Sequence, residues 1–162
     1  MPEPPARPAR GPGGYAFPTD SDDLLAWNDA ETRLAEARCY WLATTNPDGS
    51  PHVRPLWGVW VDGCFYFDGH PHTRWARNLS REPRASLHLE SATSVVIVDG
   101  AAEDINETSP ELGAAIASAW QAKYGRLVPD PATNGIFRLR PRRAHAWSED
   151  LRDGTVWQLG EA

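Results

Sequence analysis

The sequence predicts a mainly β fold with flanking helices, in which antiparallel strands close into a barrel or a sandwich. Short runs rich in aromatic and β-branched residues occur at 39–45, 51–61 and 64–67. Tight-turn signals join these runs, so neighbouring strands are expected to pair antiparallel. Two more strand candidates follow at 84–90 and 94–104, and closure of the sheet would cover their edges.

The length and the charge of the chain limit its function classes. Its 162 residues suit one compact domain. The net charge of -6 argues against a dedicated nucleic-acid binder, because phosphate backbones attract basic surfaces. No run approaches the roughly 18 apolar residues of a membrane helix, and the start Met1-Pro2-Glu3 has no apolar signal region. We therefore expect a cytoplasmic protein that binds neither nucleic acid nor a membrane.

The first twenty residues differ in composition from the rest. They contain six prolines and three glycines without a periodic apolar pattern, which predicts an extended N-terminal arm over 1–20 and a folded domain over 21–162. Ser21 is a candidate N-cap followed by acidic residues, and apolar residues then recur at helical spacing. This pattern predicts a first helix at about 22–36.

Turn chemistry sets the order of the first three strands. The segment 46–50, with the sequence Asn-Pro-Asp-Gly-Ser, places proline and glycine where a tight hairpin needs them. Asp62-Gly63 is the second hairpin signal. In the strand between the two turns, Val53, Pro55 and Trp57 alternate with more polar residues, which predicts one more apolar face.

Two further helices and the last strands are also predicted. A short helix at about 72–81 should end before Pro83, because the residue before a proline resists helical geometry. A longer helix should begin at Ser109-Pro110-Glu111 and end at Gly125. Its expected buried residues are Leu112, Ile116 and Trp120. The chain then has strand candidates near 134–140 and 143–148.

The cysteines and histidines do not predict a metal site. Cys39 and Cys64 lie in apolar strand-like runs and are expected to be buried free thiols. The sequence His70-Pro71-His72 lacks the i, i+4 spacing of a helical zinc pair, and no HExxH or CxxC pattern occurs. A metal-dependent hydrolase is therefore not favoured.

The eight tryptophans exceed what packing alone requires. They could form the wall of a large aromatic ligand site, lie in a dimer interface or belong to an ordinary core. The candidates are Trp57, Trp60, Trp75, Trp120, Trp147 and Trp157.

Two arginines on the short helix suggest an anion site. Arg74 and Arg77 are three residues apart and so share a face, with Asn78 beside them and Thr73 near the amino end of the helix. A solvated basic face is the alternative, since most surface arginines behave in that way. The residues alone leave both interpretations open.

Several segments, in their order and spacing, resemble the pyridoxamine 5'-phosphate oxidase family. These segments are 40–44, 48–57, 62–63, 73–79, Pro83 and 87–89. The resemblance covers about residues 33–148, and its strongest parts are the second strand and the sequence Ala76-Arg77-Asn78-Leu79.

The resemblance implies a six-stranded antiparallel split β-barrel that forms a homodimer, with FMN or the deazaflavin F-420 bound at the subunit interface. By similarity, one set of residues lies along the cofactor ring: Val53, Arg54, Pro55, Leu56 and Trp57. A second set lies at the cofactor phosphate: Thr73, Arg74, Trp75, Arg77 and Asn78. Many relatives carry a lysine where this chain has Trp75, so Arg74 would have to substitute for it, although the two basic residues are not interchangeable.

The implied function is an oxidoreductase that transfers a hydride between the bound cofactor and a small organic substrate. Lys123 and Tyr124 are expected on the substrate side, and no catalytic acid–base pair is assigned. The Gly-, Ala- and Arg-rich composition resembles that of high-GC actinobacteria, where deazaflavin-using relatives are common, which favours F-420 over FMN. The alternative is a split-barrel module that binds a cofactor without turnover or has lost it.

Overall fold

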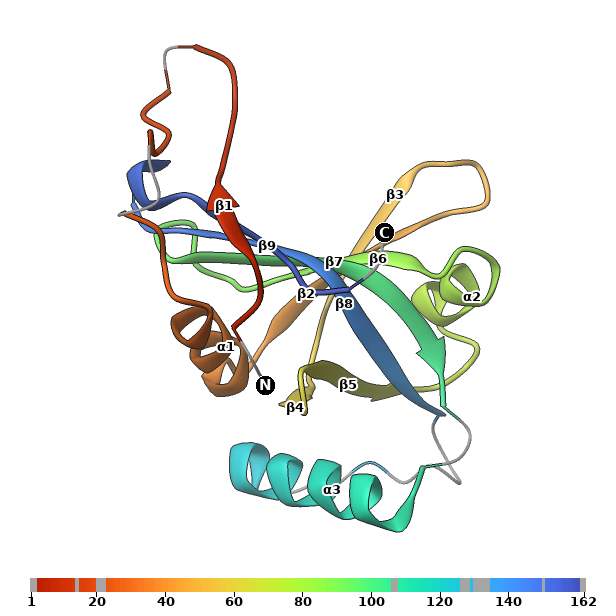
Figure 1. Cartoon of the computed structure of the whole chain (residues 1–162). Helices are drawn as coiled ribbons and strands as arrows, with labels where there is room; N and C mark the ends of the chain where they lie inside the picture. The colour runs from red at the N-terminus through yellow and green to blue at the C-terminus, as the bar shows by residue number, and fades with distance from the viewer. Residues whose placement is uncertain are drawn as a thin grey trace.

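The computed structural model describes residues 3–13, 15–19, 23–105, 108–125, 129, 135–149 and 151–160. It shows one twisted antiparallel sheet with helices on its flanks (Figure 1). The strands are β1 (Ala6–Pro8), β2 (Tyr40–Thr45), β3 (Pro51–Leu56), β4 (Val59–Val61), β5 (Cys64–Gly69), β6 (Arg84–His88), β7 (Val95–Asp104), β8 (Gly135–Trp147) and β9 (Thr155–Gln158). The helices are α1 (Trp27–Glu36), α2 (Arg74–Arg81) and α3 (Pro110–Tyr124), with a short 3-10 turn at Leu151–Asp153.

The long strand β8 divides the sheet into two parts. Along one edge it pairs with β7 from end to end. Its other edge pairs with β5 before Pro141 and with β9 after it. Because proline has no N–H to donate, Pro141 suits the point where one partner strand replaces the other. Near this point the β7–β8 register also shifts, between Asp99 and Gly100.

The backbone around Gly58 links β3, at one end of the strand path, to β4, which lies off that path. The sheet runs β1-β9-β8-β7-β6-β2-β3, and β4 and β5 attach to it through β8. The predicted strand at 51–61 is therefore two strands, β3 and β4, which turn away from each other at Trp57-Gly58. A Cβ at Gly58 would lie 2.3 Å from the Phe65 ring and 2.6 Å from the Tyr66 carbonyl oxygen, so only glycine fits this close approach.

The strand count differs from the six expected strands. Nine strands occur in the described residues, because β3 and β4 are separate and because β1 and β9 were not predicted. The two strand candidates at 134–140 and 143–148 are instead one strand, β8. The mainly β, antiparallel character and the three helices were predicted correctly.

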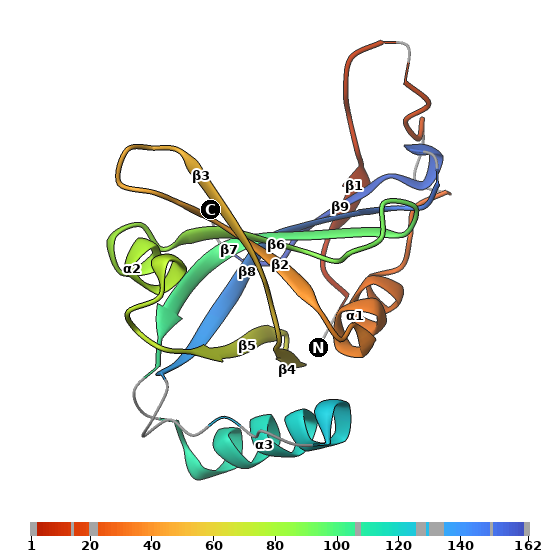
Figure 2. The ribbon, with the colours of Figure 1, turned by 180° about the vertical axis from the view of Figure 1, so that it is seen from behind.

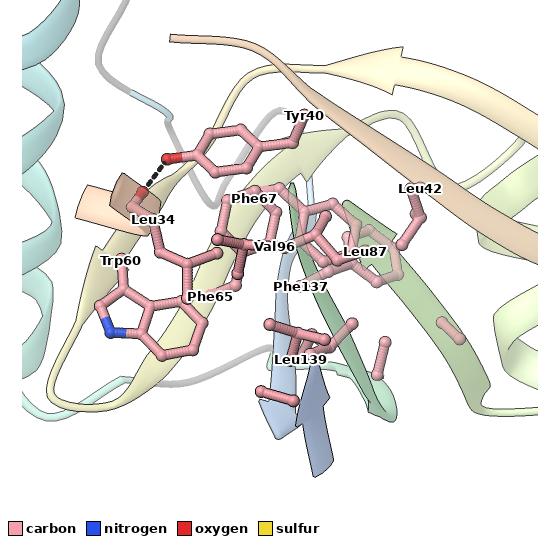
Figure 3. Close-up of a cluster of buried hydrophobic side chains, with 14 of the residues drawn as sticks. Leu34, Tyr40, Leu42, Trp60, Phe65, Phe67, Leu87, Val96, Phe137 and Leu139 are labelled. Carbon is pink, nitrogen blue, oxygen red and sulfur yellow. Dashed lines mark hydrogen bonds between the residues drawn. The ribbon is translucent and has the colours of Figure 1, made fainter. Parts of the chain in front are cut away.

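The main hydrophobic core lies inside the curved sheet (Figure 3). Tyr40 contributes its ring to this core and donates a hydrogen bond from its hydroxyl to the carbonyl of Leu34 in α1, which satisfies its one buried polar group. The other labelled core residues are Leu42, Trp60, Phe65, Phe67, Leu87, Val96, Phe137 and Leu139.

Helix α3 packs outside this core, against β4 and β5. Ser109 accepts a hydrogen bond from the Leu112 backbone N–H as N-cap, and Gly125 ends the helix with a φ of 68°, both as predicted. Ile116 and Trp120 are buried as expected, and Leu112 is half-buried. Neither α3 nor any other helix of the described residues is long and apolar enough to span a membrane.

The predicted N-terminal arm contributes a short strand to the sheet. Strand β1, at residues 6–8, pairs with β9. A carboxylate oxygen of Glu3 accepts the backbone N–H of Trp27 at 3.1 Å and so caps the first helix, which begins at Trp27 instead of residue 22. The predicted N-cap Ser21 lies outside the described residues.

Most of the candidate tryptophans belong to the core. Their exposed fractions are 9% for Trp60, 8% for Trp75, 2% for Trp120 and 0% for Trp157. The side chain of Trp57, in contrast, is 40% exposed. Both cysteines are free, as predicted, although they are half-buried and not fully buried.

Substitution of Ile116 tests the packing of α3. We expect Ile116→Ala to lower the free energy of unfolding by about 2–5 kcal/mol, because it leaves a cavity in the contact between α3 and β4. Urea denaturation measures this loss. Leu112→Ala, at a half-buried position on the same helix, should cost less. A loss below roughly 0.5 kcal/mol for Ile116→Ala would place that face of α3 in solvent.

Candidate functional site

The hairpin between β2 and β3 projects from the sheet beside α2 (Figure 2). Its turn is closed by hydrogen bonds from the Asn46 N–H to the Ser50 carbonyl and from the Gly49 N–H to the Asn46 carbonyl, both 2.9 Å long. The Asp48 carboxylate accepts the backbone N–H and the hydroxyl of Ser50, and these bonds lower the pKa of Asp48. The predicted turn chemistry therefore shapes this hairpin.

Strand β3 presents different chemistry on its two faces. His52 and Arg54 lie opposite Thr44 and Leu42 of β2, which are buried, so both side chains are on the inner face of the sheet. Val53, opposite Ala43, lies on the outer face and is 39% exposed. The expected apolar face of this strand is therefore present on the outer side.

Asn78 connects α2 to the hairpin. Its side chain is only 1% exposed, and its amide nitrogen donates to the Thr44 hydroxyl and to the Asn46 side-chain oxygen, both at 3.1 Å. Asn78 was predicted at the cofactor phosphate, but both of its N–H donors are used within the chain. It therefore positions the site and does not present its amide to a ligand.

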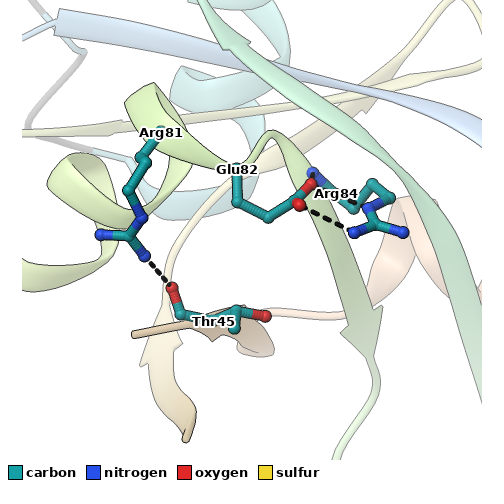
Figure 4. Close-up of polar contacts among 4 residues, drawn as sticks. All are labelled: Thr45, Arg81, Glu82 and Arg84. Carbon is teal, nitrogen blue, oxygen red and sulfur yellow. Dashed lines mark hydrogen bonds and ion pairs between the residues drawn. The ribbon is translucent and has the colours of Figure 1, made fainter. Parts of the chain in front are cut away.

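Both ends of α2 are also fixed. The Thr73 hydroxyl caps the helix by accepting the Ala76 N–H. At the other end, the Arg81 guanidinium donates to the Thr45 carbonyl at 2.8 Å (Figure 4). Glu82 next to it binds Arg84 through two side-chain hydrogen bonds, which lower the pKa of Glu82 to about 2.

Two predicted site residues meet in a hollow between the hairpin and α2. The hollow has a volume of about 420 Å³. Its lining residues are Asn46, Pro47, Asp48, His52, Arg54 and Arg74. The structure thus brings Arg54 of β3 and Arg74 of α2 together, although they are twenty positions apart in the sequence.

The hollow is electrostatically suited to an anion. Burial, Arg54 and Arg74 all lower the pKa of His52, which favours its neutral form. The Nε2 atom of His52 is buried and has no hydrogen-bond partner within the described part of the chain. The Asp48 carboxylate also lines the hollow and stays ionised, so the lining carries two guanidiniums against one carboxylate and is positive on balance.

Two other predicted phosphate residues lie elsewhere. Arg77 lines a neighbouring hollow of about 350 Å³ that also includes Glu103 and Asp104, so it does not share the hollow of Arg74. Trp75 packs against Phe67 and Phe137, at ring-centroid distances of 5.3 and 4.8 Å. Its indole therefore belongs to the core, which corrects the expectation that this side chain faces a cofactor.

Lys123 and Tyr124, predicted on the substrate side, lie where α3 meets the sheet. The Tyr124 ring stacks on Trp57 at a centroid distance of 4.9 Å, and its hydroxyl lies 2.9 Å from the Gly58 carbonyl. The Lys123 ammonium donates to the Tyr40 hydroxyl at 2.7 Å. Burial, with a smaller contribution from Arg38, lowers the pKa of Lys123 to about 8.

The outer face of the sheet has a hollow that the sequence analysis missed. Its volume is about 610 Å³, and its polar lining residues include Arg84, Ser86, Asp99, Arg142 and Arg143. Asp99 contacts His145, Arg143 and Ser86, and these contacts, that with His145 most of all, strongly lower its pKa. The period-two pattern of the strands would have placed these side chains on one face, but the pairing of distant strands was needed to bring them together.

The comparison with protein families agrees with this fold. The model described as pyridoxamine 5'-phosphate oxidase matches residues 27–148, well over half of the chain. The chain therefore belongs to the pyridoxamine 5'-phosphate oxidase family. None of the curated protein sequences matches it.

Solved structures show the same fold. A conserved hypothetical protein from Mycobacterium tuberculosis is 25% identical, with a TM-score of 0.66 over 81% of this chain and 90% of the other. An F420 reductase is 24% identical, with a TM-score of 0.54 over 83% of this chain and 98% of the other. A heme storage protein from Vibrio cholerae is 21% identical, with a TM-score of 0.57 over 71% of this chain and 87% of the other.

The buried lysine predicts a pH-dependent stability. Between its folded pKa of about 8 and its ordinary value of 10.5, the unfolded chain holds a proton on Lys123 that the folded chain has released. Raising the pH through this interval therefore favours the folded state. Measured by urea denaturation, the wild type should gain stability relative to Lys123→Met as the pH rises from about 8 to about 10.5.

The charged and titratable neighbours Arg38, Tyr40 and Tyr124 are retained in Lys123→Met, so comparing the two proteins isolates the lysine. A constant difference in stability across that pH interval would contradict the lowered pKa.

Proposed function

We propose that the protein is an oxidoreductase that binds FMN or the deazaflavin F-420 and transfers a hydride to or from a small organic substrate. One observation carries the proposal: Arg54 and Arg74 line one hollow beside the exposed strand β3, whose outer face is apolar. A flat ring with a phosphate-bearing tail needs such a combination of apolar wall and fixed cations.

The residues present fit the two ends of such a cofactor. Arg54 and Arg74 would hold the phosphate through charge-assisted hydrogen bonds, and the orphaned His52 Nε2 gives the hollow a further polar atom. Val53 and Pro55 on the outer face of β3, together with Trp57, would contact the ring. Because Arg54 is on the inner face, the cofactor would cross the edge of β3 to reach both. Among the described residues β3 pairs with β2 alone, so its other edge leaves backbone groups available to the polar rim of the ring.

The bound cofactor would supply the hydride chemistry, and the protein would bind, orient and shield it. Trp57 is held by its stack on Tyr124, so its ring would give a rigid wall near the reacting end. No catalytic acid or base is assigned.

A second copy of the chain would complete this site. The outer face of the sheet carries half-buried aromatic and aliphatic side chains, among them Trp41, Ile97 and Trp147, with Trp41 stacked on His88 at 6.4 Å. A face of this composition and an open β3 edge favour association with another copy. A homodimer would cover both and enclose the ring, leaving the substrate side near Lys123 and Tyr124.

Binding without turnover is the second candidate. Core-buried Trp75 replaces the lysine expected there, and two proteins with this fold are a heme-binding protein from Mycobacterium smegmatis and the heme storage protein from Vibrio cholerae. The visible spectrum distinguishes the candidates after incubation with each cofactor and gel filtration. The oxidoreductase is supported by a flavin band at about 450 nm, or a deazaflavin band at about 420 nm, that changes when substrate is turned over. Retention of neither cofactor would contradict it.

Removal of the hollow's arginine should weaken cofactor binding. For Arg74→Ala we expect a loss of about 1.5–3 kcal/mol, a factor of roughly ten to a hundred, because one charge-assisted contact to the phosphate is lost. Fluorescence titration with FMN and with F-420 measures this loss, and added salt should weaken wild-type binding.

Arg77→Ala is the matched control on the same helix, and its effect should be less than about threefold. An equal loss for both variants would restore Arg77 to the phosphate site. Unchanged binding in Arg74→Ala would contradict the proposal, provided that the melting temperatures of the cofactor-free variants match that of the wild type.

Sedimentation tests the second copy. We expect a species of twice the 17.9 kDa chain mass at micromolar concentration. Val53→Asp introduces a charge on the outer face of β3 and should shift the protein toward the monomer. Thr32→Asp, at an exposed position of α1, should not. A stable wild-type monomer would contradict the dimer.

A further inference from the structure

A second basic hollow lies far from the hairpin, where the end of α1, the start of β2 and the last turn of α3 meet. Its volume is about 440 Å³. Its charged lining residues are Glu36, Arg38 and Lys123, and the remaining walls are formed by alanine side chains and Trp60. None of its lining residues belongs to the Arg54–Arg74 hollow.

Lys123 is held with one donor unused. Its Nζ lies 2.7 Å from the Tyr40 hydroxyl and 3.3 Å from the Gly58 carbonyl. The Tyr40 hydroxyl gives its own proton to the Leu34 carbonyl, so Lys123 is the donor in both bonds. An ammonium group has three N–H donors, and no partner for the third is found among the described residues.

Arg38 is fixed beside it with most of its donors available. One guanidinium nitrogen donates to the Lys123 carbonyl, and the guanidinium carbon lies 5.5 Å from the centre of the Tyr124 ring. Arg38 forms no ion pair with a carboxylate in the described part of the chain. A guanidinium has five N–H donors, so it retains capacity for a planar, two-oxygen acceptor.

The two cations therefore lie together, and neither forms an ion pair with a carboxylate in the described part of the chain. A partly buried ammonium group with no acidic partner is unfavourable, and its lowered pKa reflects that cost. Glu36 lines the same hollow, but it forms no ion pair with Lys123 or Arg38. An external anion would supply the missing charge.

We propose that this hollow binds a small organic carboxylate with an apolar body, held by Arg38 and by the ammonium group of Lys123. The alanine and tryptophan walls suit the apolar body, and the two cationic side chains suit the carboxylate. This proposal does not depend on the cofactor, because it uses no residue of the hairpin or of α2.

Binding at this hollow must be coupled to the protonation of Lys123. A carboxylate beside the ammonium group favours its charged form and so raises its pKa. By linkage, affinity should fall as the pH rises through about 8, because less of the protein then carries the proton.

The chain has a single lysine, which makes the test direct. Protein labelled with ¹³C-lysine gives one side-chain NMR signal, whose pH titration reports the Lys123 pKa without assignment. Benzoate is the probe, and benzamide is its neutral control of nearly the same shape. We expect benzoate to raise the Lys123 pKa and benzamide to leave it unchanged.

The affinity for benzoate should be up to about thirtyfold lower at about pH 9.5 than at about pH 6.5, on either side of the Lys123 pKa. Arg38→Gln should weaken binding about tenfold or more. Arg81→Gln is the matched control, since Arg81 also donates to a backbone carbonyl but lies beside β2 and α2. Melting temperatures would confirm that both variants are folded.

Glu36→Gln tests whether the two cations bind an external carboxylate or the carboxylate of Glu36 in another conformation. Removing this carboxylate should leave benzoate affinity unchanged or increase it. The proposal would be overturned if benzoate did not shift the Lys123 pKa, if benzamide bound equally well, or if Arg38→Gln and Arg81→Gln weakened binding equally.

Discussion

The candidate site depends on the buried side chain of Asn78. Its two hydrogen bonds reach Thr44 and Asn46, and these join α2 to the strand and to the turn that carry the rest of the site. Asn78 and Thr44 are buried and Asn46 is half-buried, so losing this contact would leave polar groups unpaired at a cost of about 1–3 kcal/mol. Together with the bond from Arg81 to Thr45, this contact holds α2 against the hairpin, where two guanidiniums that repel each other line one hollow.

The division of β8 determines which surfaces remain available. At Pro141 the partner strand changes from β5 to β9, so β8 belongs to both parts of the sheet. The turn at Gly58 then leaves β3 as an edge strand with exposed apolar residues. An exposed apolar edge is a liability in a free monomer. In this chain the exposed edge of β3 lies beside a cationic hollow. The proposed cofactor and the proposed second copy would therefore both bind at this surface.

Local sequence signals predicted most of the helices, strands and turns. Contacts between residues distant in the sequence determine how these elements pack. The caps Ser109 and Gly125 and the turn at 46–50 act within a few residues, so the sequence predicted them. The cap that Glu3 provides to Trp27 joins residues 24 positions apart and has no local signal. Similarly, the helical spacing placed Arg74 and Arg77 on one face of α2. With Asn78 and Trp75 packed inward, however, Arg74 lines one hollow and Arg77 lines another. His52 could have been suggested by its period-two relation to Arg54, whereas the burial of Trp75 required the positions of Phe67 and Phe137.

The central claim is that Arg54 and Arg74 bind one phosphate together. A double-mutant cycle of Arg54→Gln and Arg74→Gln, with cofactor affinity as the readout, measures this directly. When two side chains bind the same phosphate, the effects of their substitutions on affinity should be coupled. We expect an interaction free energy of about 0.5–3 kcal/mol between Arg54→Gln and Arg74→Gln. Effects that add to within about 0.3–0.5 kcal/mol would show that the two arginines act independently, and they would contradict the account.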